Sequence, residues 1–249
     1  MKRMISLILI LLVTLGTVSC KIDSPPQESD DTGGKKLAVF FPGMGYNIDR
    51  PLLFYSRELL EKEGYEILSI EWNDSIKTRY DQVSELLDKI DFDEYEDVIF
   101  VSKSIGTEIS SAYVVNHNLR VRQIWYTPLQ GTFDVCSGDI EEGSIIAFIG
   151  TNDERSNVYQ IKIKAEQLNI ELHVYDYCDH SLECKDDSKN QEVLDDVIKI
   201  TCDFVISERI TLPAILYNET ENYQLYRQIG FIEEIQRIYN KQKGTFVYN

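Results

Sequence analysis

The stretch Val98–Gly106 (VIFVSKSIG) decides the fold of this chain. Its first four residues are apolar and predict a buried strand, and residues 107–115 after it predict a helix. A tight five-residue turn lies between them, with small residues, Ser102 and Gly106, at its two ends. A turn of this kind pushes its central residue, Ser104, out at the carboxyl edge of a sheet. The pattern therefore indicates a nucleophilic serine.

Two later predicted strands supply an acid and a base. Ser144–Gly150 (SIIAFIG) reads as a buried strand, and Asp153 follows it directly. Ile170–Tyr175 (IELHVY) reads as the next strand, and His180 lies in the segment after it. A serine, an acid and a histidine thus follow three strand ends in this order. This is the chain order of one known arrangement of the Ser-His-Asp triad.

On these residues, the chain over about 36–206 resembles the α/β-hydrolase superfamily, and above all its small, lid-poor, esterase-like members. The resemblance implies an α/β fold: a mostly parallel sheet with helices on both faces and no cap domain. It also implies Ser104 as nucleophile, His180 as general base and Asp153 as the acid that orients the histidine. No cofactor and no metal are expected.

The oxyanion hole is expected from two backbone segments. Lys36–Phe41 predicts a short strand, and a glycine-bearing loop with Met44 and Gly45 follows it. Hydrolases of this fold place half of the hole in such a loop, where glycine allows close approach of the backbone. The other N–H would come from Ile105, the residue after the nucleophile.

The rest of the hydrolase-like span alternates between strands and helices, which favours a parallel sheet covered on both faces. Further strands are predicted over 65–71 and 123–127, and helices over 51–63, 75–90, 154–168 and 191–206. Only residues 128–143 lie between two of the strands where many esterases carry a cap. We therefore expect an open site that suits small or surface-presented acyl groups.

Several other polar residues compete for these roles. Asp134 follows the strand at 123–127 and is the alternative acid, whereas Asp179 reads as a loop-surface acid. Lys103 is expected to be exposed on the turn. His173 alternates with apolar residues in a strand, and His117 lies at a helix end, so both are expected to be structural.

Four of the five cysteines lie within the hydrolase-like span. Cys178 and Cys184 bracket His180, but they lack the paired Cys-x-x-Cys spacing of common zinc sites. A disulfide between them, which would brace the histidine segment, stays open. Cys136 and Cys202 are expected to be buried as small apolar side chains.

The amino terminus has the pattern of an export signal. Met1–Arg3 is basic, residues 4–15 are apolar, and small residues precede Cys20. This resembles a bacterial lipoprotein signal, which implies a signal peptide over 1–19, lipidation of Cys20 and a flexible tether over 20–35. The protein would then be extracytoplasmic and membrane-anchored. A secretory signal cut nearby and an uncleaved anchor are the alternatives.

Charge and the carboxyl-terminal sequence complete the picture. A formal net charge of −17 disfavours binding to nucleic acid and to anionic lipid head groups.

Residues 207–249 form an appendage outside the hydrolase-like span, and Leu225–Phe231 (LYRQIGF) resembles the end of a GNAT-type N-acetyltransferase. The glycine-rich loop that holds acetyl-CoA in that family is absent from the sequence.

The sequence therefore predicts a membrane-tethered serine hydrolase that cleaves a small or exposed carboxylic ester through an acyl-enzyme. The alternative is a lipid-anchored binding or scaffold protein that uses the same fold without turnover. The complete set of triad residues favours the enzyme. The sequence leaves the acyl group and the oligomeric state open.

Overall fold

The computed structural model describes residues 34–72, 78–136 and 140–207, and the structural statements that follow concern these residues. The expected signal peptide (1–19) and Cys20 lie outside them. So do the expected tether (20–35) and appendage (207–249), apart from residues 34, 35 and 207.

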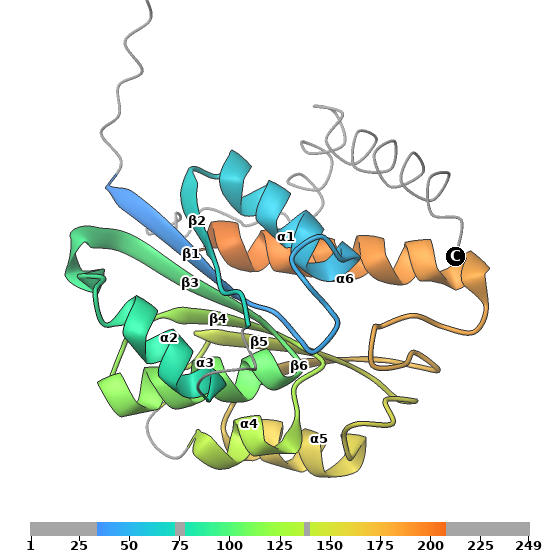
Figure 1. Cartoon of the computed structure of the whole chain (residues 1–249). Coiled ribbons are helices and arrows are strands. Elements are labelled where there is room, and N and C mark those ends of the chain that lie inside the picture. Colours follow the sequence, from blue (N-terminus) through green and yellow to red (C-terminus); the bar gives the residue numbers. More distant parts are fainter. Residues whose placement is uncertain (1–33, 73–77, 137–139, 208–249) are drawn as a thin grey trace, which may run out of the picture. The chain divides into compact units, whose positions relative to one another are not determined.

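One six-stranded, all-parallel sheet organises the described chain (Figure 1). Its strand order is β2-β1-β3-β4-β5-β6. The strands are β1 (Lys35–Phe41), β2 (Tyr65–Ser69), β3 (Tyr95–Lys103), β4 (Arg122–Tyr126), β5 (Ile145–Gly150) and β6 (Glu171–Tyr175). The inner strands β3, β4 and β5 are buried almost throughout, as expected of a sheet with helices on both faces.

Helices cover both faces of this sheet (Figure 1). On one face lie α1 (Pro51–Lys62) and α6 (Asp187–Ser207), which pack against each other over a core that includes Phe40, Tyr126 and Phe148. On the other face lie α2 (Arg79–Leu87), α3 (Ile105–His117), α4 (Gln130–Val135) and α5 (Val158–Gln167). The predicted fold class is therefore confirmed.

The helix boundaries differ from the sequence prediction where side chains cap the backbone. α5 begins at Val158 rather than at Glu154, because the Asn157 side chain caps it by accepting a hydrogen bond from the Gln160 N–H. α2 begins after Thr78, whose hydroxyl accepts from the Asp81 N–H. α6 begins earlier than predicted, and the short helices α4 and Phe92–Glu94 were not predicted.

No cap domain interrupts the sheet between β4 and β5, where α4 is the helix among the described residues. The carboxyl ends of the strands are therefore not covered by an inserted domain. Within the described residues, no helix is both long enough and apolar enough to cross a membrane.

Candidate active site

Ser104 stands on a strained turn between β3 and α3. Its backbone has φ 54° and ψ −121°, a region that residues other than glycine rarely adopt. The Ser104 N–H donates to the Tyr126 carbonyl at 3.0 Å, which ties the turn to β4. Gly106 makes the turn possible, since a Cβ there would lie 2.1 Å from the Phe41 carbonyl oxygen. Ser102 is fully buried and donates to the Ser110 hydroxyl, as a small residue at this position can.

The structure brings the three predicted triad residues into contact. His180 Nε2 lies 2.7 Å from Ser104 Oγ. On the other side of the ring, His180 Nδ1 lies 2.7 Å and 2.9 Å from the two carboxylate oxygens of Asp153. The Asp153 side chain is fully buried, and one of its oxygens also accepts from the Arg155 N–H. The three side chains form one continuous line of hydrogen bonds from Asp153 to Ser104.

The segment Asp176–Cys184, here called the histidine loop, is held in place by several local contacts. A disulfide joins Cys178 to Cys184 and closes the loop around His180. The Asp179 carboxylate accepts backbone N–H bonds within the loop, including one from Ser181 at 2.7 Å. The loop is also bound to the end of β5, because the Asn152 N–H donates to the Cys178 carbonyl.

Gly150, the last residue of β5, explains how these two segments approach so closely. A Cβ at Gly150 would lie 2.1 Å from the Cys178 carbonyl oxygen. Glycine is therefore needed at this strand end for Asp153 and His180 to meet. The sequence shows a glycine here, but its role depends on a contact 28 residues away along the chain.

The segment Pro42–Tyr46, here called the 42–46 loop, lies beside the nucleophile. Gly43 of this loop packs against the serine, since a Cβ on it would lie 3.3 Å from the Ser104 Cβ. Gly43 was not singled out in the sequence, although it belongs to the same Pro-Gly-Met-Gly motif. Two backbone hydrogen bonds between Gly43 and Tyr46 close the loop. The two expected oxyanion residues in this loop both face open space. Met44 is 69% exposed, and a Cβ on Gly45 would meet nothing within 4 Å.

Ile105, the other expected oxyanion donor, is the first residue of α3. The first N–H groups of a helix have no partner within it, and they carry the positive end of the helix dipole. Its position next to Ser104 suits an N–H that faces an anion at the serine.

The expectation that Lys103 is exposed on the turn was wrong. Lys103 is 1% exposed, and its Nζ donates to the Thr127 hydroxyl at 2.6 Å and to the His180 carbonyl at 2.8 Å. Burial lowers the pKa of Lys103 to about 7, although nearby Asp153 and Asp179 act in the opposite direction. A lysine in a turn predicts an exposed side chain, but here the 42–46 loop, Thr127 and the histidine loop pack around Lys103.

The other acidic and histidine residues considered for these roles make contacts with residues outside the triad. Asp134, the alternative acid, is on α4 and forms an ion pair with Lys164. His173 lies beside Glu171 and stacks on Phe148. His117 ends α3, where it lies 3.1 Å from Asp88. Cys136 and Cys202 are buried, as expected.

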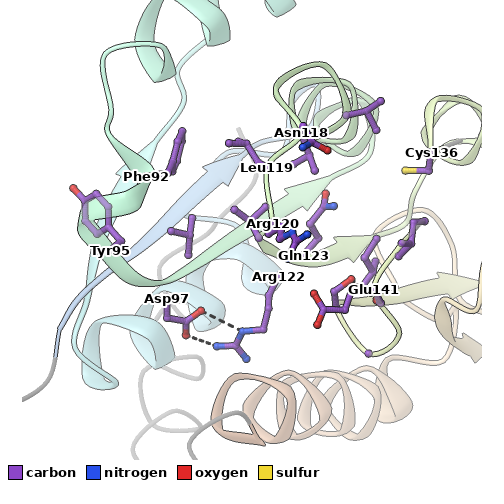
Figure 2. Close-up of a pocket in the computed structure, with 18 of the residues that line it drawn as sticks. Phe92, Tyr95, Asp97, Asn118, Leu119, Arg120, Arg122, Gln123, Cys136 and Glu141 are labelled. Carbon is purple, nitrogen blue, oxygen red and sulfur yellow. Dashed lines mark hydrogen bonds and ion pairs between the residues drawn. The ribbon is translucent and has the colours of Figure 1, made fainter. Parts of the chain in front are cut away.

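A large hollow lies elsewhere, at the amino ends of β3, β4 and β5 (Figure 2). Its volume is about 1070 Å³, and its lining contains none of the triad residues. Figure 2 shows Arg122 paired with Asp97 in its wall, and Arg122 also donates to the carbonyl oxygens of Phe204 and Val205. The guanidinium of Arg122 thus binds both Asp97 and the end of α6. The triad lies at the opposite, carboxyl ends of the strands.

Comparison with known proteins identifies the fold. No family model matches the sequence, and no curated protein matches it. Solved structures do match. An α/β serine hydrolase without lid from Xanthomonas campestris has a TM-score of 0.54 at 15% identity, over 76% of this chain and 88% of that one.

Two further solved structures are similar to this chain. The esterase Pf2001 from Pyrococcus furiosus has a TM-score of 0.54 at 12% identity, over 72% of this chain and 84% of that one. Est1E from Butyrivibrio proteoclasticus has a TM-score of 0.53 at 12% identity, over 71% and 90%. At this low identity the likeness establishes the fold: the chain has the α/β-hydrolase fold.

Proposed function

We propose that this protein is a serine hydrolase that cleaves carboxylic esters through Ser104, His180 and Asp153. The observation that carries the proposal is the unbroken line of hydrogen bonds from the buried Asp153 through His180 to the strained Ser104. Lid-less and esterase members among the similar structures support the same class of reaction.

Each residue has a defined role in this reaction. Serine is a weak nucleophile at its own pKa, so His180 Nε2 takes the hydroxyl proton as Ser104 Oγ attacks the ester carbonyl. Asp153 fixes the tautomer in which Nδ1 carries a proton, and it stabilises the imidazolium that forms. His180 then gives the proton to the leaving alcohol, and an acyl-enzyme remains on Ser104. Water, activated by the same imidazole, releases the acid.

The oxyanion of the tetrahedral intermediate needs donors preorganised on one side of Ser104. We assign one donor to the N–H of Ile105, at the start of α3. We assign the other to the 42–46 loop, at Met44 or Gly45, since the Gly43 N–H already donates to Tyr46. The closeness of Gly43 to Ser104 supports this assignment.

The substrate class follows from the absence of a cap between β4 and β5. An open site offers little apolar surface for a long acyl chain, so the natural substrate is a small ester or an acyl group presented on a surface. The acid product and alcohol product leave directly to solvent.

Kinetics of purified variants on p-nitrophenyl acetate test the proposal. Ser104→Ala, His180→Ala and Asp153→Asn should each lower kcat by ~10³-fold or more, with the effect of Asp153→Asn about tenfold milder than the others. Because triad members work as a unit, the double variant Ser104→Ala/His180→Ala should be hardly worse than Ser104→Ala.

Asp134→Asn is the matched control, since it removes an acid that lies on α4 and pairs with Lys164. It should leave kcat within a few-fold of the wild type. If Asp134→Asn loses turnover while Asp153→Asn retains it, the proposal has placed the catalytic acid after the wrong strand. A folded wild type without any esterase activity would favour the alternative, a binding protein with this fold.

We also propose that the hydrolase is tethered to a membrane through lipidated Cys20, outside the cytoplasm. The apolar stretch and small residues before this cysteine support the proposal. Mature protein should begin at Cys20 and partition into detergent, and Cys20→Ala should abolish the partitioning. Recovery of full-length, unmodified protein in the cytosol would contradict it.

A further inference from the structure

Lys103 is a buried lysine that contacts two loops beside the nucleophile. It is the last residue of β3, directly before Ser104, and it is 1% exposed. Lysine is almost never fully buried without partners, so its contacts need an explanation beyond the fold. The proposed reaction does not use its amine.

On one side, Lys103 holds the histidine loop. Its Nζ donates at 2.8 Å to the backbone carbonyl of His180 itself and at 2.6 Å to the hydroxyl of Thr127, which follows β4. The amine therefore fixes the backbone of the base to the strand that precedes the nucleophile. The disulfide closes the histidine loop, and the Lys103 amine binds the loop to the end of β3.

On the other side, Lys103 contacts the 42–46 loop. Its Cγ lies 3.2 Å from the position of a Cβ on Gly43, and its Nζ lies 4.9 Å from the centre of the Tyr46 ring. Gly43 and Tyr46 are the two ends of the backbone hydrogen bonds that close this loop. One side chain thus touches both the segment that carries the base and the segment assigned to the oxyanion hole.

We propose that Lys103 is a positioning residue that holds the histidine loop and the 42–46 loop in their catalytic arrangement around Ser104, and that its neutral amine does so best. The inference rests on the proposed hydrolase function. It adds that the residue before the nucleophile makes activity depend on pH near neutrality.

Burial of the amine, acting against the nearby carboxylates, supports the second part of the inference. Asp153 and Asp179 favour its ammonium form, Arg155 opposes it, and Tyr46 faces it from the 42–46 loop. Burial outweighs these charges and brings the pKa of Lys103 to about 7. A neutral amine has two N–H groups for its two acceptors, Thr127 and His180. The ammonium form carries a third N–H and a charge that the buried site solvates poorly.

The test compares the wild type with Lys103→Met, which keeps the length of the side chain and removes the amine. At pH 8.5, kcat on p-nitrophenyl acetate should fall by ~10- to 100-fold, since small misplacements of catalytic groups cost this much. KM should change less than about threefold, because a buried residue does not bind substrate. The ratio of wild-type to variant kcat should be several-fold larger at pH 8.5 than at pH 6.

Two further variants separate positioning from simple loss of packing. Thr127→Val removes one acceptor of the amine and should lower kcat in the same direction, whereas Thr127→Ser keeps the hydroxyl and should remain near the wild type. Lys164→Met is the control for loss of a lysine far from the site, and it should leave kcat unchanged. Thermal unfolding of each variant establishes that it is folded.

The outcomes are distinct. If the wild type turns over and kcat is unchanged in Lys103→Met, the positioning role is overturned while the proposed function stands. A loss that is equal at pH 6 and pH 8.5 overturns the role of the neutral amine. Should Lys103→Met not fold, an unchanged kcat in Thr127→Val overturns the positioning role. Absence of both turnover and fluorophosphonate labelling in the wild type overturns the proposed function, and the inference with it.

Discussion

At the scale of single residues, the site depends on a backbone that most residues cannot adopt. Ser104 has a positive φ, which costs of order 1–3 kcal/mol and persists only when its surroundings impose it. Gly106 supplies part of that constraint, because β1 runs directly against it. The hydrogen bond from the Ser104 N–H to Tyr126 supplies another part. In this conformation Ser104 Oγ lies 2.7 Å from His180 Nε2.

Gly106→Ala should destabilise the fold strongly. The added Cβ would lie 2.1 Å from the Phe41 carbonyl and 2.9 Å from the Pro42 carbonyl, and neither backbone group can move away cheaply. We expect a loss of about 3 kcal/mol or more in the free energy of unfolding, measured by urea titration. Gly131→Ala is the control, because its Cβ would meet only the flexible end of Glu108, and it should cost about 1 kcal/mol or less. Equal costs for the two variants would contradict the tight packing at Gly106.

The lowered pKa of Lys103 should make the stability of the protein, as well as its activity, depend on pH. Its pKa falls from an ordinary value of 10.5 to about 7 in the folded protein, so the unfolded chain binds more protons between these values. The stability of the wild type should therefore rise with pH in this window, relative to Lys103→Met. We expect the difference to change by about 2 to 3 kcal/mol between pH 7 and pH 9 in urea titrations. A difference that stays constant over this range would show that the amine titrates normally.

Residue identities predicted which residues meet at Ser104 but not the environment of Lys103. Small residues at both ends of the turn are needed for any such turn, so Ser104 could be found from local sequence. The burial of Lys103 arises where the 42–46 loop, Thr127 and the histidine loop meet, and no local pattern encodes that meeting. For the same reason the sequence did not show that Gly43 packs against Ser104.

At the scale of elements, the strands were easier to predict than the loops and helix starts. The central strands are continuous apolar runs, which is what burial on both faces requires. Helix starts depend on caps such as Asn157, where a side chain competes for the first N–H groups. The pairing of Cys178 with Cys184 stayed open in the sequence, and the structure shows them joined.

The Cys178–Cys184 disulfide should matter for activity because it closes the loop that carries His180. The double variant Cys178→Ala/Cys184→Ala should lose about 2 kcal/mol of stability, as expected for a short closed loop. We also expect kcat on p-nitrophenyl acetate to fall by about tenfold, because the base becomes less well positioned. Dithiothreitol should lower the wild-type rate and leave the double variant unaffected. Equal rates for the wild type with and without reductant, once reduction is verified by mass, would contradict this role.

At the scale of the whole molecule, the proposed active site and the hollow with the Arg122–Asp97 pair lie at opposite ends of the parallel strands. The triad and its loops gather at the carboxyl ends of the parallel strands, as ligand sites in open α/β sheets do. The amino ends hold the hollow with the Arg122–Asp97 pair, whose bonds tie the sheet to α6. Alternation of strands and helices in the sequence was enough to predict this architecture. The substrate could not be predicted, because the loops that would recognise it have no sequence pattern of their own.

The central claim is that Ser104 is a nucleophile activated by His180 and Asp153. Labelling with a fluorophosphonate, followed by mass spectrometry of the proteolysed protein, tests it most directly. We predict one adduct, on the peptide that contains Ser104, in the wild type and in Asp134→Asn. Labelling should be slowed by ~10³-fold or more in His180→Ala and should disappear in Ser104→Ala. An unlabelled, folded wild type, or an adduct on a serine other than Ser104, would contradict the account.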